Sequence, residues 1–157
     1  MVPKLENLEA WFPIISIFSV GQRERQMATK EIHQITLEKA TNEYAVSRLP
    51  PNAAIPPWAD GPGFVTISRS ASELSIVCPA ERVPAGTHTE GNWSCLRFVG
   101  PFAFGTTGIV LSVVRPLSEG GLGVFVVSTF DGDHILIKDS DLPTAVRLLE
   151  NAGHILC

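Results

Sequence analysis

The alternation of hydrophobic and polar residues along the chain predicts several short strands in the first half. Residues 35–49 alternate in part and are rich in β-branched side chains, which is typical of a strand. Residues 64–69 and 73–79 are two further β-rich runs, and the three small residues between them predict a hairpin. Five prolines within residues 50–62 exclude a long helix there. At most a short helical turn fits at residues 52–58.

The second half predicts the order strand, helix, strand, strand, helix, strand. The corresponding residues are 93–99, 106–117, 124–129, 134–138, 143–152 and 154–156. Both helices carry apolar residues at helical spacing, and Pro116 is expected to kink the first one or end it early. Residues 124–129 form an unbroken apolar run, which is typical of a strand buried on both faces.

This order of elements is the βαββαβ plan of ferredoxin-like folds. The first half repeats the plan weakly, with a short turn in place of a helix. A unit of about 60 residues is only marginally stable alone, and two such units packed together relieve that weakness. We therefore predict an α+β fold with two ferredoxin-like units side by side, a degenerate unit at residues 35–91 and a second at residues 92–157.

The N-terminal residues do not fit this plan. Residues 1–34 are predicted to be a poorly ordered extension. Residues 1–26 are hypothesised to be an unstructured extension or an artefact of start-site choice, because Met27 opens a second plausible start. The apolar run at residues 11–20 is too short to cross a bilayer, which needs about 20 residues. No membrane association is expected.

Charge and cysteine usage narrow the function classes. The chain has 12 Lys and Arg against 16 Asp and Glu, with no basic run, so nucleic acid is not expected as a partner. Cys78, Cys95 and Cys157 are widely spaced and predict neither a disulfide framework nor a metal site. Cys78 and Cys95 are interpreted as small buried hydrophobes, and a reducing cytoplasm is the expected location. No metal or cofactor is predicted.

Three blocks of the sequence resemble the ACT-domain family that includes the cytosolic arginine sensors of animals. The blocks are FVTISRSASELSIVCP at residues 64–79, EGNWSCLRFVGPFAF at 90–104 and TGIVLSVVRPLSEGGLGVFVVSTFDGDHILI at 107–137. Proteins of this family carry paired ACT modules related to the regulatory modules of aspartate kinase. The resemblance implies sensing of a small molecule, generally an amino acid, at ACT interfaces without catalysis.

The resemblance also implies a ligand site in two segments of the second unit. One is the loop after the first strand of that unit, and the other is the turn after its second strand. In this chain the candidate residues are Val99, Gly100, Pro101, Phe104, Gly108, Ile109, Thr129, Phe130, Asp131 and Asp133. Family members commonly have an aspartate at the position of Ala103.

The residues themselves allow a physical account of this site. A strand that runs through Gly100 into a helix near Thr107 leaves backbone N–H groups at a helix N-terminus, which favours an α-carboxylate. Asp131 and Asp133 follow a strand, where they can accept hydrogen bonds from an ammonium or guanidinium group. The alternative interpretation is structural, because glycine and Asp-Gly-Asp are also common in tight turns.

The favoured hypothesis is a cytoplasmic, non-catalytic ACT-type regulatory protein that binds an amino acid and forms a homodimer. The alternative is a structural module that mediates dimerisation or protein interaction and binds no ligand. A small enzyme is a third hypothesis, with Ser128, Thr129 and His134 as candidate groups, but the sequence offers no evident oxyanion element.

Overall fold

A computed structural model describes residues 33–157 of the chain. The predictions for residues 1–26, and nearly all of the predicted extension at 1–34, lie outside the described residues. In the described part, no helix has the length and apolar character needed to cross a membrane.

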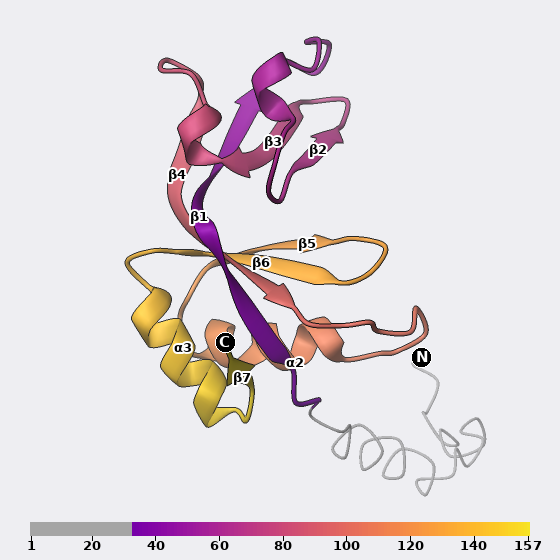
Figure 1. Ribbon diagram of the computed structural model, residues 1–157, viewed down its shortest axis with the longest axis vertical. Helices are drawn as coiled ribbons and strands as arrows, with labels where there is room; N and C mark the ends of the chain where they lie inside the picture. Colours follow the sequence, from indigo (N-terminus) through magenta and orange to yellow (C-terminus); the bar gives the residue numbers. More distant parts are fainter. Residues whose placement is uncertain (1–32) are drawn as a thin grey trace, which may run out of the picture. The chain divides into compact units, whose positions relative to one another are not determined.

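One seven-stranded sheet organises these residues (Figure 1), with the order β2-β3-β1-β4-β6-β5 and with β7 paired to β1. The strand pairs are antiparallel except for β1 with β7, which is parallel. The strands are β1 Thr36–Leu49, β2 Thr66–Arg69, β3 Leu74–Pro79, β4 Thr89–Phe98, β5 Val124–Ser128, β6 Asp133–Lys138 and β7 Ile155–Leu156. The structure confirms the predicted strand at 35–49 and the hairpin, which is β2 with β3.

Two α-helices, α2 (Ile109–Glu119) and α3 (Leu142–Asn151), belong to the second half of the chain. Figure 1 shows both on the same side of strands β5 and β6. The first half has single turns of 3-10 helix instead, η1 (Pro57–Ala59) and η2 (Ala80–Arg82). The proline-rich segment thus holds only a short turn, as predicted.

The prediction that Pro116 ends its helix early was wrong, because α2 continues to Glu119. A proline lacks the N–H that would bond the carbonyl four residues earlier, here that of Ser112. The imidazole of His154 takes over this role, since its Nε2 lies 2.9 Å from the Ser112 carbonyl oxygen. The Nδ1 of the same ring accepts the Ile35 N–H at 3.2 Å. A buried side chain therefore satisfies the carbonyl that the proline leaves without its helical partner.

The prediction for residues 124–129 also needs correction. β5 lies at the edge of the sheet, and Phe125 and Val126 are 36% and 38% exposed. An apolar run therefore marks an edge strand here and not a strand buried on both faces.

Three clusters of buried residues hold the sheet in place. The largest lies between the sheet and the two helices and includes Leu96, Phe98, Leu117 and Leu149. It also includes Leu37 from the beginning of β1. The second cluster centres on Tyr44, Val77, Cys95 and Leu136, and the third on Ala59, Leu74, Ile76 and Cys78.

The fold is α+β and ferredoxin-like, as predicted. The division into two units at 35–91 and 92–157 stays a prediction. β1 and β4 are long strands that pair with each other and run through both halves of the sheet, so the sheet itself shows no boundary between the units. Cys78 and Cys95 are buried, as expected from their apolar surroundings, and Cys157 is exposed.

Candidate functional site

The loop after β4 and the hairpin between β5 and β6 meet at the beginning of α2, where they enclose a cavity of about 280 Å³. We call this the loop cavity. Its lining residues come from these two loops and the first turn of the helix. They are Phe102, Ala103, Phe104, Thr106, Ile109, Val110, Ser128, Thr129, Phe130, Gly132 and Asp133.

Half of the predicted site residues line the loop cavity: Phe104, Ile109, Thr129, Phe130 and Asp133. The other five, Val99, Gly100, Pro101, Gly108 and Asp131, belong to the same two loops but do not line it.

Gly100 has a structural role beside the cavity. A Cβ atom built on Gly100 would lie 3.1 Å from the carbonyl oxygen of Asp131. Only glycine lets the loop after β4 approach the β5–β6 turn this closely without a shift of backbone. The predicted residue Asp131 therefore contacts the loop through its main chain.

An aromatic pair stands at the cavity. Phe104 from the loop and Phe130 from the turn are each 79% exposed, and their ring centroids lie 5.0 Å apart at an interplanar angle of 74°. This edge-to-face geometry is a favourable one for aromatic rings. Two exposed aromatic rings at a cavity provide an apolar surface for a ligand.

The first turn of α2 contributes backbone donors. The helix begins after Gly108, which has a φ of 93° and gives no side-chain cap. The first N–H groups of any α-helix have no partner within the helix, and they carry the positive end of the helix dipole. Ile109 and Val110, which hold two of these N–H groups, line the loop cavity. This end of the cavity favours an anionic group such as a carboxylate.

The opposite chemistry comes from the β5–β6 hairpin. Asp133 at the start of β6 accepts a hydrogen bond from the Ser128 hydroxyl, which holds the carboxylate in place. The Thr129 hydroxyl donates to the Gly132 carbonyl at 2.7 Å, and the Thr129 N–H donates to the same oxygen at 2.8 Å. Thr129 therefore stabilises the turn, while Asp133 is the carboxylate that lines the cavity.

Six lining residues were absent from the predicted set: Phe102, Ala103, Thr106, Val110, Ser128 and Gly132. All of them are neighbours of predicted residues in the same two loops or the same helical turn. Their proximity in sequence was the signal that could have found them.

The described residues thus form a ferredoxin-like sheet with its helices on one side and a cavity at a loop between strand and helix. Residues 88–151 match the family model of the ACT domain. Residues 42–86 match a second model, described as an N-terminal domain. The second half of the chain therefore matches an ACT domain, and the fold of the described residues is ferredoxin-like.

Among characterised relatives, the cytosolic arginine sensor for mTORC1 subunit 1 from Bos taurus is 29% identical over 117 residues, which cover 66% of this chain and 35% of the relative. The human protein of the same name is 26% identical over 132 residues, covering 79% of this chain and 38% of the relative. The chain therefore spans little more than a third of the length of these sensors.

Two solved structures place the fold. An Agobacterium tumefaciens protein solved by X-ray crystallography is 53% identical, with a TM-score of 0.77, covering 80% of this chain and 93% of that chain. Aspartate kinase from Clostridium acetobutylicum is 15% identical with a TM-score of 0.54, covering 80% of this chain and 37% of that chain. The likeness to the kinase is a likeness of fold.

Proposed function

We propose that this chain is a non-catalytic, cytoplasmic regulatory protein that binds an amino acid in the loop cavity. The observation that carries the proposal is that one cavity is lined both by the first turn of a helix and by a carboxylate. The first turn of α2 supplies N–H donors for an α-carboxylate, and Asp133 supplies an acceptor for an ammonium or guanidinium group. Two relatives are named as cytosolic arginine sensors, and this supports arginine as the first candidate for the ligand.

The ten predicted site residues remain part of this proposal, with roles that follow from their positions. Phe104 and Phe130 cover the aliphatic part of the ligand. Asp131, exposed in the turn, adds negative charge near the cationic end. Val99, Gly100, Pro101 and Gly108 shape the loop that leads into α2.

A thermal-shift screen with the twenty amino acids, beginning with arginine and lysine, tests the proposal. A ligand at 100 times its Kd adds about 2.7 kcal/mol to the free energy of unfolding. Such a gain raises the unfolding temperature measurably. No shift for any amino acid at millimolar concentration would contradict the proposal.

A pair of matched variants tests the placement of the ligand. Asp133→Asn removes the charge in the cavity, and Asp139→Asn removes the same charge outside it. Each aspartate accepts a hydrogen bond from a serine hydroxyl, from Ser128 and Ser94 respectively, so the local structural effects are comparable. We expect Asp133→Asn to abolish the ligand-induced shift and Asp139→Asn to retain it. An unchanged shift in Asp133→Asn would place the ligand elsewhere.

The exposed edge strand favours a second function, in which the chain is a dimerisation module. Within residues 33–157, one edge of β5 has no strand partner, and the side chains of Phe125 and Val126 are partly exposed. Such an edge can pair with the same edge of a second copy, which gives a homodimer. Light scattering coupled to gel filtration measures the mass, and Val126→Lys should convert a dimer formed in this way into monomer. A dimer together with no amino-acid response would favour this second function over sensing.

A further inference from the structure

A second cavity, of about 380 Å³, lies on the face of the sheet opposite the two helices. Leu96 and Phe98 of β4 pack into the helix-side core, so the alternating residues Cys95 and Arg97 point to the other face. Both of the latter line the cavity. We call it the sheet-face cavity. Its lining comes from β1, β4, β6 and the segment before β2, so it lies apart from the loop cavity.

The base of the sheet-face cavity is buried and largely apolar. Tyr44 and Cys95, both 1% exposed, lie at its base and belong to the second buried cluster. Phe64 forms a wall and stacks on the imidazole of His134, with centroids 3.9 Å apart and planes within 14°. Tyr44 also accepts the Phe64 N–H at 3.4 Å, which fixes the aromatic wall to the base.

The rim of this cavity carries an ion pair. Arg97 pairs with Glu38, its cross-strand neighbour, and both side chains are about half exposed. Lys39 also lines the cavity, but its cross-strand partner is Leu96, which packs in the helix-side core, so the Lys39 side chain leaves the sheet on the other face. Arg97 is therefore the cation at the opening, and Glu38 is its partner there.

His134 responds to this environment. Burial first, and then the charge of Arg97, lower the pKa of the imidazole, while the charge of Asp133 acts in the other direction. Its Nδ1 is buried and has no hydrogen-bond partner in the described part of the chain. The ring is therefore neutral at pH 7 and serves as a spectroscopic reporter of charge in the cavity.

We propose that the sheet-face cavity binds a small organic carboxylate with a short apolar body, whose charged end lies against Arg97 and whose body packs on Phe64. The volume falls within the range of about 300–1,000 Å³ that is usual for small-molecule sites. An apolar base with a guanidinium group at the opening is an arrangement that orients such an anion. This proposal is independent of the amino-acid site in the loop cavity.

A titration with 3-phenylpropionate and its neutral amide, 3-phenylpropanamide, tests the proposal on the whole chain. The two probes share one apolar body and differ in charge. Calorimetry gives the two Kd values, and the imidazole resonances of His134 report where binding occurs. We expect the carboxylate to bind at least tenfold more tightly than the amide and to shift the His134 signals. Equal affinities, or binding that leaves His134 unchanged, would overturn the proposal.

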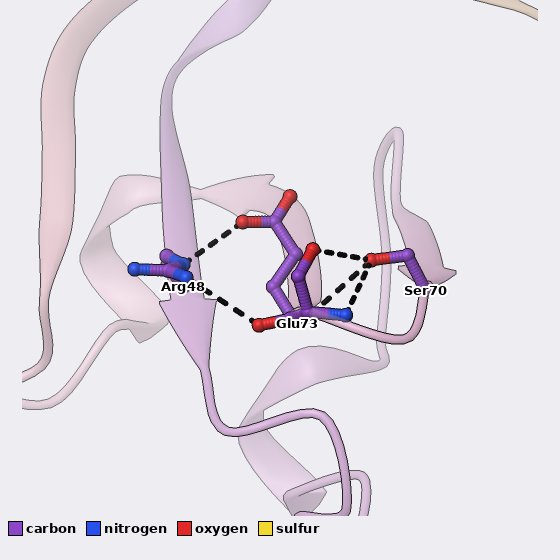
Figure 2. Close-up of polar contacts among 4 residues, drawn as sticks. Arg48, Ser70 and Glu73 are labelled. Atoms are coloured by element: carbon purple, nitrogen blue, oxygen red, sulfur yellow. Dashed lines mark hydrogen bonds and ion pairs between the residues drawn. The ribbon is translucent and has the colours of Figure 1, made fainter.

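The chain offers a matched control for the cationic residue. Arg48 pairs with Glu73 at 2.9 Å in the first half of the chain (Figure 2), with side chains 55% and 40% exposed. The Arg97–Glu38 pair has nearly the same exposure, 51% and 49%. We expect Arg97→Gln to weaken 3-phenylpropionate binding tenfold or more and Arg48→Gln to leave it unchanged. Equal effects of the two variants would overturn the proposal.

The sign of a second pair of variants separates a specific site from general loss of structure. Glu38 competes with the ligand for Arg97, so Glu38→Gln should tighten binding of 3-phenylpropionate. Glu73→Gln, in the control pair, should have no effect. Weaker binding in Glu38→Gln would contradict the assigned role of Arg97.

Inorganic phosphate and the amino-acid site are distinguished in the same experiments. Phosphate that binds as tightly as 3-phenylpropionate would overturn the requirement for an apolar body. Asp133→Asn should leave 3-phenylpropionate binding within twofold of the unmodified chain, so failure of the loop cavity as a site and failure of the sheet-face cavity are observed separately.

Discussion

Replacement of His154 by alanine tests how the chain tolerates Pro116 inside α2. The imidazole is 4% exposed and bonds two backbone groups that lie far apart in sequence, the N–H of Ile35 and the carbonyl of Ser112. The Ile35 group is buried, and a buried group without a partner costs about 1–3 kcal/mol. The Ser112 carbonyl is only partly buried, so we assign it about 1 kcal/mol. His154→Ala should therefore destabilise the fold by about 2–4 kcal/mol.

A double-mutant cycle isolates the role of the proline. Pro116→Ala restores the N–H that can donate to the Ser112 carbonyl, so the histidine is no longer needed for that bond. The cost of His154→Ala should fall by about 1 kcal/mol in the Pro116→Ala background. Urea unfolding followed by circular dichroism measures the four free energies. If the two costs of His154→Ala agree within about 0.3 kcal/mol, the histidine does not compensate for the proline.

Three further predictions concern single side chains. Ellman's reagent at pH 8 should modify Cys157 alone in the folded protein, because burial raises the pKa of Cys95 to about 12; reaction of all three thiols without denaturant would contradict this. His134→Phe keeps the aromatic stack and removes a group whose pKa burial lowers in the folded state. The imidazole binds a proton more strongly in the unfolded state than in the folded state, so the free energy of unfolding of the unmodified chain should fall as pH falls from 6.5 toward the folded pKa. Urea unfolding at a series of pH values should show a smaller fall for His134→Phe. Leu117→Ala, at a fully buried position on α2, should cost about 2–5 kcal/mol in urea unfolding, and a cost below about 1 kcal/mol would contradict its place in the core.

Local patterns in the sequence predicted the elements well where packing agrees with propensity. Residues 64–69 and 73–79 contain the predicted hairpin, because each run is rich in β-forming residues and only three small residues separate them. Two predictions failed for reasons that lie outside the local sequence. The end of α2 depends on His154, which is 38 positions after Pro116, and the exposure of β5 depends on its place at the sheet edge.

The two cavities also differ in how much of their lining the local sequence could predict. The loop cavity is built from segments that follow neighbouring strands, so a strand-to-helix loop and a tight turn were enough to predict residues such as Phe104 and Asp133. The sheet-face cavity joins side chains from β1, β4 and β6 with Phe64. Strand order and register decide that contact, and neither follows from the alternation of polar and apolar residues in a single strand.

The start of β6 connects the two cavities physically. Asp133 and His134 are consecutive, and side chains alternate across a strand, so one lines the loop cavity and the other lines the sheet-face cavity. A ligand that ordered this strand end from one face would also restrict the wall of the other cavity. Thermodynamic linkage makes any such coupling reciprocal, so arginine and 3-phenylpropionate would change each other's affinity by the same factor. Any coupling between two ligands on opposite faces of the sheet would therefore pass through the start of β6, where Asp133 and His134 lie.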